Sequence, residues 1–291
     1  SPLFHELVPY VIFAPTDFQI NDYTGNMASW NDFGKFIYSL NQGRDVLPVD
    51  VQQKVSELLN GVSDTHEKIK RLYHFMQQST RYISIQLGIG GWQPHTAEFV
   101  AKNGYGDCKA LTNYMYSLLK FAGIESFYVL IRSGRGANYL TEDFPSNQFN
   151  HAILAVPAQT DTVWLECTDQ TLPAGYLSGF TENRPALLIK EDGSKLVRTP
   201  VYGMNENVQV RNIEGKINQN GALELTASSR YTGVQQDDIH SMINSLTSEK
   251  VKEVLSERFN LATYDVNNFK YKAEKSAVPE INEDLDITVY N

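Results

Sequence analysis

The stretch YGDCKALTNYMYSLLKFAG, residues 105–123, decides the fold of this chain because it predicts a buried amphipathic helix. Asp107 is a good N-cap residue, since its side chain can accept a hydrogen bond from the free N–H groups of the first turn. Gly123 suits the left-handed conformation that ends many helices. Between them, apolar residues recur at helical spacing, at Leu111, Tyr114, Met115, Leu118, Leu119 and Ala122. We therefore expect one helix over residues 107–122, packed against the rest of its domain.

Cys108 lies at the start of this helix. A free cysteine is more often a small buried apolar residue than a reactive one. Here, however, the neighbours Asp107 and Lys109 are charged, and the free N–H groups and dipole of a first helical turn favour an anion. A helix N-terminus and a nearby imidazolium both lower the pKa of a thiol. The position therefore makes Cys108 the candidate nucleophile.

Three strands are predicted after the helix, over residues 127–132, 149–156 and 162–166, and we expect them in one antiparallel sheet. A turn-like stretch separates the last two, so that His151 falls opposite residues 166–168 in a hairpin. A shift of one residue in register exchanges the faces of a strand. The pairing therefore places an acid near His151 and leaves Glu166 and Asp169 both open.

A thiol nucleophile needs one histidine beside the sulfur and an acceptor for the other ring nitrogen. The competing histidines are His5, His66, His74, His95 and His240. We expect exposed helix positions for His66 and His74, and His240 belongs to another part of the chain. Cys167 is expected to pack in the core. A structural disulfide between Cys108 and Cys167 is the alternative that would remove the nucleophile.

The patterning divides the chain into three parts. Residues 1–50 are irregular and aromatic, and we expect a leader or the remnant of an upstream β-rich domain. Residues 51–204 hold the predicted helices, the sheet and the candidate triad. Residues 205–291 contain a predicted hairpin with a glycine-containing turn, a helix over 248–259 and further strands. We expect this last part to be a separate β-rich module without catalytic residues, truncated within a strand.

Composition excludes several classes of function. The 291 residues include 34 acidic and 25 basic side chains, a net charge of −9, which argues against a general nucleic-acid or anionic-membrane binder. No apolar run is long enough to span a membrane, and the N-terminal residues lack the pattern of a signal peptide. No spacing of cysteine and histidine suggests zinc, so we expect neither a metal nor a cofactor. The expected partner is a peptide or protein substrate, and the oligomeric state stays open.

Three short motifs, in this order, resemble those of the transglutaminase-like superfamily. They are Gly106-Asp107-Cys108 at the head of the helix, Asn150-His151-Ala152 entering a strand, and Glu166-Cys167-Thr168 after a strand with Trp164. The superfamily has Asp-x-Thr at the third motif, so this chain departs from it by carrying glutamate. The resemblance covers about residues 50–200. Within the superfamily, the chain is similar to bacterial proteins whose transglutaminase-like core lies between two β-rich domains.

The resemblance implies a papain-like α+β core, with cysteine on a central helix and histidine and acid on an antiparallel sheet. It selects Glu166 over Asp169 as the acid, and it implies thiol attack on an amide carbonyl through a thioester. We expect hydrolysis of a peptide or isopeptide bond, with an amine-accepting transglutaminase as one alternative and a catalytically silent peptide-binding module as another. The Cys108 N–H and the Gln86 side chain are the candidate oxyanion donors. The bacterial relatives imply a periplasmic, cell-envelope or secreted location.

Overall fold

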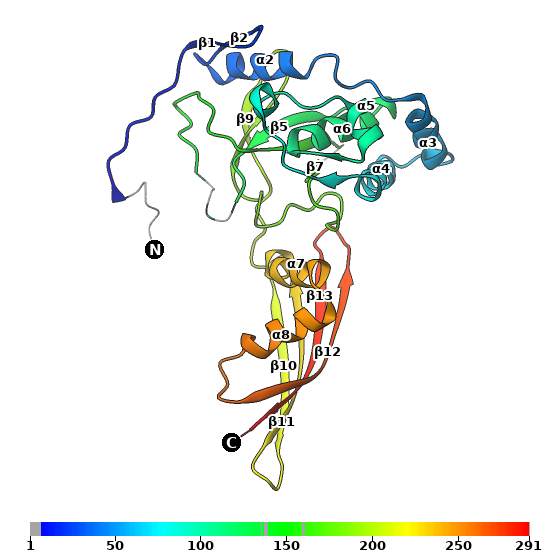
Figure 1. Ribbon diagram of the computed structural model, residues 1–291, viewed down its shortest axis with the longest axis vertical. Coiled ribbons are helices and arrows are strands. Elements are labelled where there is room, and N and C mark those ends of the chain that lie inside the picture. The colour runs from blue at the N-terminus through cyan, green and yellow to red at the C-terminus, as the bar shows by residue number, and fades with distance from the viewer. Residues whose placement is uncertain (1–6, 135, 137–138, 159–160, 291) are drawn as a thin grey trace.

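The computed structural model describes residues 7–134, 136, 139–158 and 161–290, arranged as two parts that follow one another along the chain (Figure 1). The N-terminal part mixes helices and strands, as the sequence predicted. Its helices are α2 (Trp30–Asn41), α3 (Val49–Leu59), α4 (Thr65–Ser79), α5 (Ala97–Asn103) and α6 (Cys108–Phe121), with a 3-10 turn η1 (Gly88–Gly91). Its strands are β1 (Asp17–Ile20), β2 (Tyr23–Asn26), β3 (Arg81–Tyr82), β4 (Tyr105–Gly106), β5 (Phe127–Ile131), β6 (His151–Pro157), β7 (Thr162–Leu165), β8 (Pro185–Leu188) and β9 (Lys195–Arg198).

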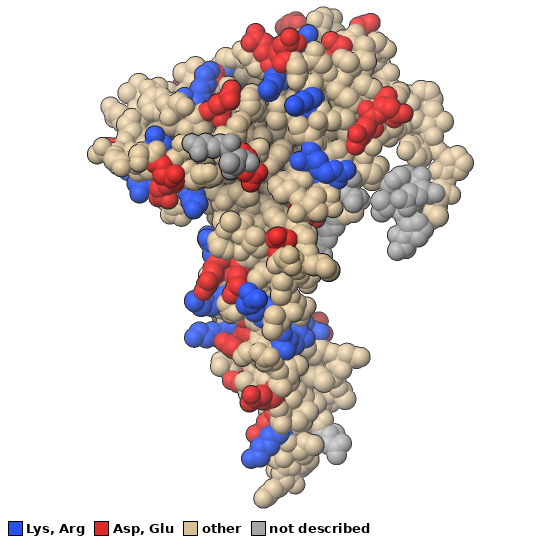
Figure 2. Space-filling view, turned by 180° about the vertical axis from the view of Figure 1, so that it is seen from behind, with Lys and Arg blue, Asp and Glu red and all other residues tan. Residues whose placement is uncertain are grey.

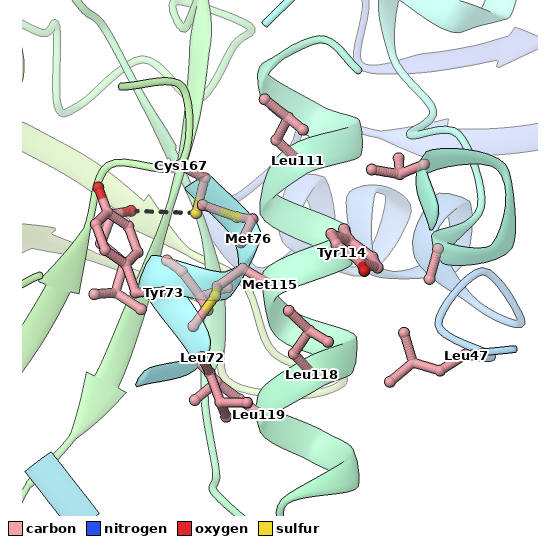
Figure 3. Packing of buried hydrophobic residues seen from close by; sticks show 14 of the residues in the cluster. Leu47, Leu72, Tyr73, Met76, Leu111, Tyr114, Met115, Leu118, Leu119 and Cys167 are labelled. Carbon is pink, nitrogen blue, oxygen red and sulfur yellow. Dashed lines mark hydrogen bonds between the residues drawn. The ribbon is translucent and has the colours of Figure 1, made fainter. Parts of the chain in front are cut away.

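Helix α6 is the central element of this part. The Asp107 side chain accepts a hydrogen bond of 2.9 Å from the Ala110 N–H, as expected of an N-cap. Every residue of the first two turns, 108–115, is buried. Side chains of α6 pack against α3, α4, α5 and one face of the sheet, and Figure 3 shows Leu119 of α6 beside Leu72 of α4. Burial on all sides fixes the position of the helix and hence of Cys108.

The sheet beside α6 is five-stranded and antiparallel, in the order β7-β6-β5-β8-β9. It contains all three strands that the sequence predicted after the helix. In the register of the β6–β7 hairpin, Leu154 pairs with Leu165 and Ala155 with Trp164, and the turn residues 159–160 lie outside the described residues. The strand β6 therefore lies between β7 and β5, and His151 enters it directly opposite Ile131 of β5.

Helix α2 packs with the sheet even though it belongs to the first fifty residues. Phe33, Phe36 and Leu40 of α2 share a core cluster with Leu130 and Leu187 of the sheet. The opposite face of the sheet is covered by the segment between β7 and β8, through Leu177. Residues 30–41 are thus an integral layer of the N-terminal part, where the sequence suggested a leader or remnant.

The C-terminal module is a four-stranded antiparallel sheet in the order β10-β11-β13-β12. Its elements are β10 (Gln209–Ile217), β11 (Leu223–Thr232), β12 (Tyr264–Glu274), β13 (Glu280–Val289), the helices α7 (Asp237–Ser245) and α8 (Ser248–Arg258), and the 3-10 turn η2 (Gly233–Gln235). The predicted hairpin and the helix over 248–259 are confirmed as β10–β11 and α8, whereas the sequence missed α7. Acidic and basic side chains alternate along the face of the module in Figure 2. Helix α7 lies at the end nearest the N-terminal part (Figure 1).

Membrane-spanning helices and metal-binding clusters are both absent from the described ranges. None of the helices within them combines the length and the apolar character needed to cross a bilayer. Within the same ranges, no three side chains of histidine, cysteine, aspartate or glutamate are grouped so as to hold a metal ion.

Candidate active site

Cys108 is the first residue of α6, and only 3% of it is exposed. Two residues earlier, Gly106 ends β4, which pairs in parallel with β3. A Cβ atom at position 106 would lie 2.8 Å from the Ala110 Cβ, which is too close for two carbon atoms. Glycine therefore allows the first turn of α6 to follow this strand so tightly, and this explains the Gly-x-Cys spacing physically.

The residues on either side of Cys108 form a buried ion pair. The Lys109 ammonium binds one oxygen of Asp107, while the other oxygen caps the helix. Both residues are more than nine-tenths buried, so removal of either would leave the other charge unpaired in the interior. The pair neutralises Lys109 within the first turn and holds the N-cap in place.

His151 is buried, and its Nε2 atom lies 2.9 Å from each carboxylate oxygen of Glu166. The Cys108 side chain is near enough to the ring to help raise the pKa of His151. Since Glu166 occupies Nε2, Nδ1 is the nitrogen left for the sulfur. The structure thus brings together the three residues that the sequence selected, with the imidazole between thiol and carboxylate.

Glu166 follows β7 directly, and only 2% of it is exposed. Besides His151, its carboxylate accepts hydrogen bonds from the Thr168 hydroxyl at 2.6 Å and N–H at 3.2 Å, and from the Thr181 hydroxyl at 3.4 Å. The Tyr73 hydroxyl donates to the Glu166 backbone carbonyl at 2.5 Å. Side chain and backbone are therefore both fixed, and the longer glutamate still reaches the imidazole.

The charges of this pair reinforce one another. Burial by itself would lower the pKa of His151, but the charge of Glu166 and the hydrogen bonds with Cys108 and Glu166 raise it to about 10. Burial opposes ionisation of Glu166, yet the charge and hydrogen bond of His151 and the contacts with Thr168 hold its pKa below the ordinary value. At neutral pH the pair is an imidazolium and a carboxylate. An imidazolium beside a sulfur stabilises the thiolate, which is the reactive form of cysteine.

The segment between β7 and β8 adds two residues that sequence reasoning missed. Phe180 packs edge-on against the His151 ring, with ring centroids 5.3 Å apart and planes at 70°, although 42% of Phe180 is exposed. Thr181 is fully buried and donates to Glu166. Nothing in their local sequence marks either residue, because the loop is brought to the site only by tertiary structure. Thr168, in contrast, was part of the quoted Glu-x-Thr motif.

Asp169 has a different role from Glu166. Its Oδ1 atom accepts hydrogen bonds from the N–H and hydroxyl of Thr171 and from the N–H of Leu172, at 2.6 to 2.8 Å. This arrangement caps a turn. The described contacts of His151 therefore favour Glu166 between the two acids that the hairpin register left open.

The other cysteine and the other described histidines have different surroundings. Cys167 is free and packs in the core around α6, as predicted (Figure 3), and Cys108 is free as well, which excludes the disulfide alternative in this structure. His66 and His74 are exposed, as predicted. His95 stacks on Phe99, and His5 lies outside the described residues. Gln86, one of the two candidate oxyanion donors, is also exposed.

A cavity of about 650 Å³ lies toward the other end of α6. Tyr116 and Lys120 of α6 line it together with Tyr38 of α2 and Lys190 after β8. Cys108, His151 and Glu166 do not line it. The size of this cavity therefore gives no reason to move the candidate site away from the thiol.

No protein-family model and no curated protein matches this chain. Among solved structures it is similar to a "putative protease" from Parabacteroides distasonis, at 10% identity and a TM-score of 0.45 over 89% of this chain. It is also similar to a "putative cysteine protease" from Cytophaga hutchinsonii, at 11% identity and a TM-score of 0.33 over 58% of this chain. The match spans 53% and 57% of those chains, about half of each. With identities and TM-scores this low, the functional proposal rests on the residues of the site.

Proposed function

We propose that this chain is a cysteine-dependent amide hydrolase with a transglutaminase-like, papain-like core, in which Cys108, His151 and Glu166 form the catalytic triad. The observation that carries the proposal is the buried His151, whose Nε2 is 2.9 Å from both oxygens of Glu166, while the nearby Cys108 side chain also raises the pKa of the ring. A structural histidine needs no thiol partner. A thiol, an imidazole and a carboxylate in this order form the relay that thiol nucleophiles require.

The reaction would proceed in two steps. The Cys108 thiolate attacks the amide carbonyl, the C–N bond breaks, and the His151 imidazolium gives its proton to the departing amine, which leaves a thioester. Water then attacks the thioester, with His151 taking its proton, and the acid product and the thiol are released. Glu166 holds the imidazole in orientation and stabilises its charge, and the Cys108 N–H at the helix N-terminus stabilises the oxyanion. An amine in place of water would give the transamidation product through the same thioester.

The substrate class we propose is a peptide or isopeptide bond, and the location we propose is the cell envelope or the exterior, both by the resemblance of the three motifs. The silent binding module is the rival proposal. It predicts that a peptide binds and that no bond to Cys108 forms.

Intact-protein mass spectrometry during turnover of a library of peptides and isopeptide-linked peptides distinguishes the two. An active enzyme gives a transient acyl adduct on Cys108 and cleaved product. The adduct and the product should vanish in Cys108→Ala and persist in Cys167→Ala, which is the matched control because Cys167 is the chain's other, equally buried cysteine. Peptide binding without adduct or product from any library member would establish the binding module instead.

A further inference from the structure

Helix α7 of the C-terminal module reaches the loop that covers the candidate triad. The carboxylate of Asp237, the first residue of α7, accepts hydrogen bonds from the Gly179 N–H at 2.7 Å and from the Tyr176 hydroxyl at 2.8 Å. Gln236 donates to the same carboxylate at 2.8 Å. Two of these three donors belong to the segment between β7 and β8, so the carboxylate joins the module to that loop.

The residues directly after Gly179 contact the triad. Phe180 packs against the His151 ring and Thr181 donates to Glu166. Gly179 is held at both ends, because Asp237 binds its N–H and the buried Arg184 donates to its C=O at 3.0 Å. The residue that the Asp237 carboxylate binds, Gly179, thus directly precedes Phe180, whose ring packs against His151.

A second contact joins α7 to the segment after Glu166. His240 Nε2 lies 2.7 Å from the hydroxyl of Thr171, which also bonds to Asp169. A pocket of about 330 Å³ lies between the two parts, lined by Thr168, Asp169 and neighbouring residues on one side and by Asp237, His240 and their neighbours on the other. The module therefore contacts the chain on both sides of the site. His240 binds Thr171 after Glu166, and Asp237 binds Gly179 before Thr181.

We propose that Asp237 is a positioning residue of the candidate active site, acting through Gly179 to hold Phe180 on His151 and Thr181 on Glu166. The inference rests on the proposed function for its catalytic consequence, although the positioning itself can be measured without any reaction. It gives the C-terminal module a part in the chemistry, where the sequence suggested a module with none.

The test compares Asp237→Asn with Asp238→Asn in the full chain. Gly179 and Tyr176 donate to different oxygens of the carboxylate. Asparagine replaces one of these oxygens by an NH2 donor and removes the charge, so one of the two donors loses its acceptor and the other keeps a weaker, uncharged one. Asp238 is the matched control because it is the next residue of the same helix turn and is exposed. The first measurement is the NMR spectrum of the labelled His151 ring, whose resonances respond to the Phe180 ring packed edge-on against it. The second is the rate of Cys108 alkylation by iodoacetamide across pH 5 to 9.

We expect Asp237→Asn to shift the His151 resonances and to slow alkylation at pH 6 about two- to tenfold, the effect of one hydrogen bond, while Asp238→Asn changes neither. Unmoved His151 resonances in Asp237→Asn would overturn the positioning role. Moved resonances with an unchanged pH profile of alkylation would overturn its catalytic consequence.

Two further measurements decide the proposal if the first variant does not fold or if Cys108 is not reactive. If Asp237→Asn does not fold, Tyr176→Phe removes one donor to Asp237 and retains the ring, and it should shift the same resonances to a smaller extent; no shift there would overturn the proposal. If Cys108 of the unaltered protein proves no more reactive than an ordinary thiol, the proposed function fails, and the His151 resonances still decide whether Asp237 positions the loop.

Discussion

Two buried carboxylates, one in each part of the molecule, have similar burial and different partners. Glu166 is 2% exposed and Glu283 of β13 is 1% exposed. Glu283 binds the guanidinium of Arg258 at the end of α8, and arginine stays protonated throughout the working pH range. Glu166 binds the imidazole of His151, which can give up its proton and which has a thiol as its other neighbour. Burial of a charged pair is thus common to both parts, and only a titratable partner beside a nucleophile turns the pair into a candidate for chemistry.

The hydroxyl donors around the two carboxylates are alike in number. Each carboxylate accepts from two hydroxyl groups, which are those of Thr168 and Thr181 for Glu166 and those of Tyr231 and Tyr271 for Glu283. In the C-terminal module this network ties α8 to the sheet. The comparison predicts that matched substitutions in the two parts separate effects on reactivity from effects on stability.

The largest expected effect is that of His151→Gln. Loss of the general acid and base should lower the rate of amide hydrolysis roughly 10²- to 10⁴-fold. His240→Gln is the matched control, because His240 is also buried and hydrogen-bonded but lies in the C-terminal module. We expect it to change the rate far less. Equal losses of activity in the two variants, measured on the same peptide substrate, would end the assignment of His151.

Glu166→Gln should mainly lower the reactivity of Cys108, whereas Glu283→Gln should mainly lower the stability of the fold. Without its carboxylate partner the His151 imidazolium is less stable, so alkylation of Cys108 at pH 6 should slow roughly tenfold. Glu283→Gln leaves Arg258 partly buried without its counter-ion, and we expect about 3 kcal/mol less free energy of unfolding. Urea unfolding and alkylation rates of both variants check this pattern. A large loss of alkylation in Glu283→Gln at unchanged stability would contradict the comparison.

The pH dependence of stability should differ between the two pairs. The pKa of His151 is raised from 6.5 to about 10 in the folded protein, so its contribution is fully present below pH 6.5 and is lost as the pH rises through about 10. His151→Gln should therefore flatten the decline in the free energy of unfolding between pH 7 and 10, measured by urea titration. The Arg258 pair should contribute no slope in this range. An unchanged slope in His151→Gln would show that the histidine is not held as an imidazolium.

The smallest effect is expected for Asp169→Asn. Asp169 caps a turn and makes no described contact with His151, so alkylation of Cys108 should change less than about twofold, with about 1 kcal/mol of stability lost with its hydrogen bonds. The measurement is the same alkylation assay at pH 6. A stronger effect than that of Glu166→Gln would reverse the order of the two acids.

Much of the fold was predictable from sequence because its signals are local. The cap at Asp107, the apolar spacing of α6 and the alternation after Gly123 place the helix and the three neighbouring strands within one or two residues. The predicted hairpin pairing then limited the candidates for the acid to Glu166 and Asp169. The resemblance of the third motif favoured Glu166, which is the one that contacts His151.

What the sequence could not reveal depends on contacts between distant segments. Phe180, Thr181 and Asp237 have no motif, since their relation to His151 arises only when the loop after β7 folds back and α7 meets it. The short helix α7 was missed because the residue before it is Gln236, which is not one of the residue types that typically mark a helix N-terminus. Its side chain makes no capping hydrogen bond in the structure. The role of α2 as a layer on the sheet was hidden for a similar reason, because its partners on the sheet, Leu130 and Leu187, lie about a hundred residues or more further along the chain.

The most direct test of the central claim is the rate of Cys108 alkylation by iodoacetamide as a function of pH, followed at each cysteine by peptide mass spectrometry. If the imidazolium of His151 stabilises the thiolate, Cys108 should react at a nearly constant rate from pH 7 down to about pH 5, while the fully buried Cys167 stays unmodified. A rate that falls tenfold for each pH unit below about 8.5, as for an ordinary thiol, would contradict the triad.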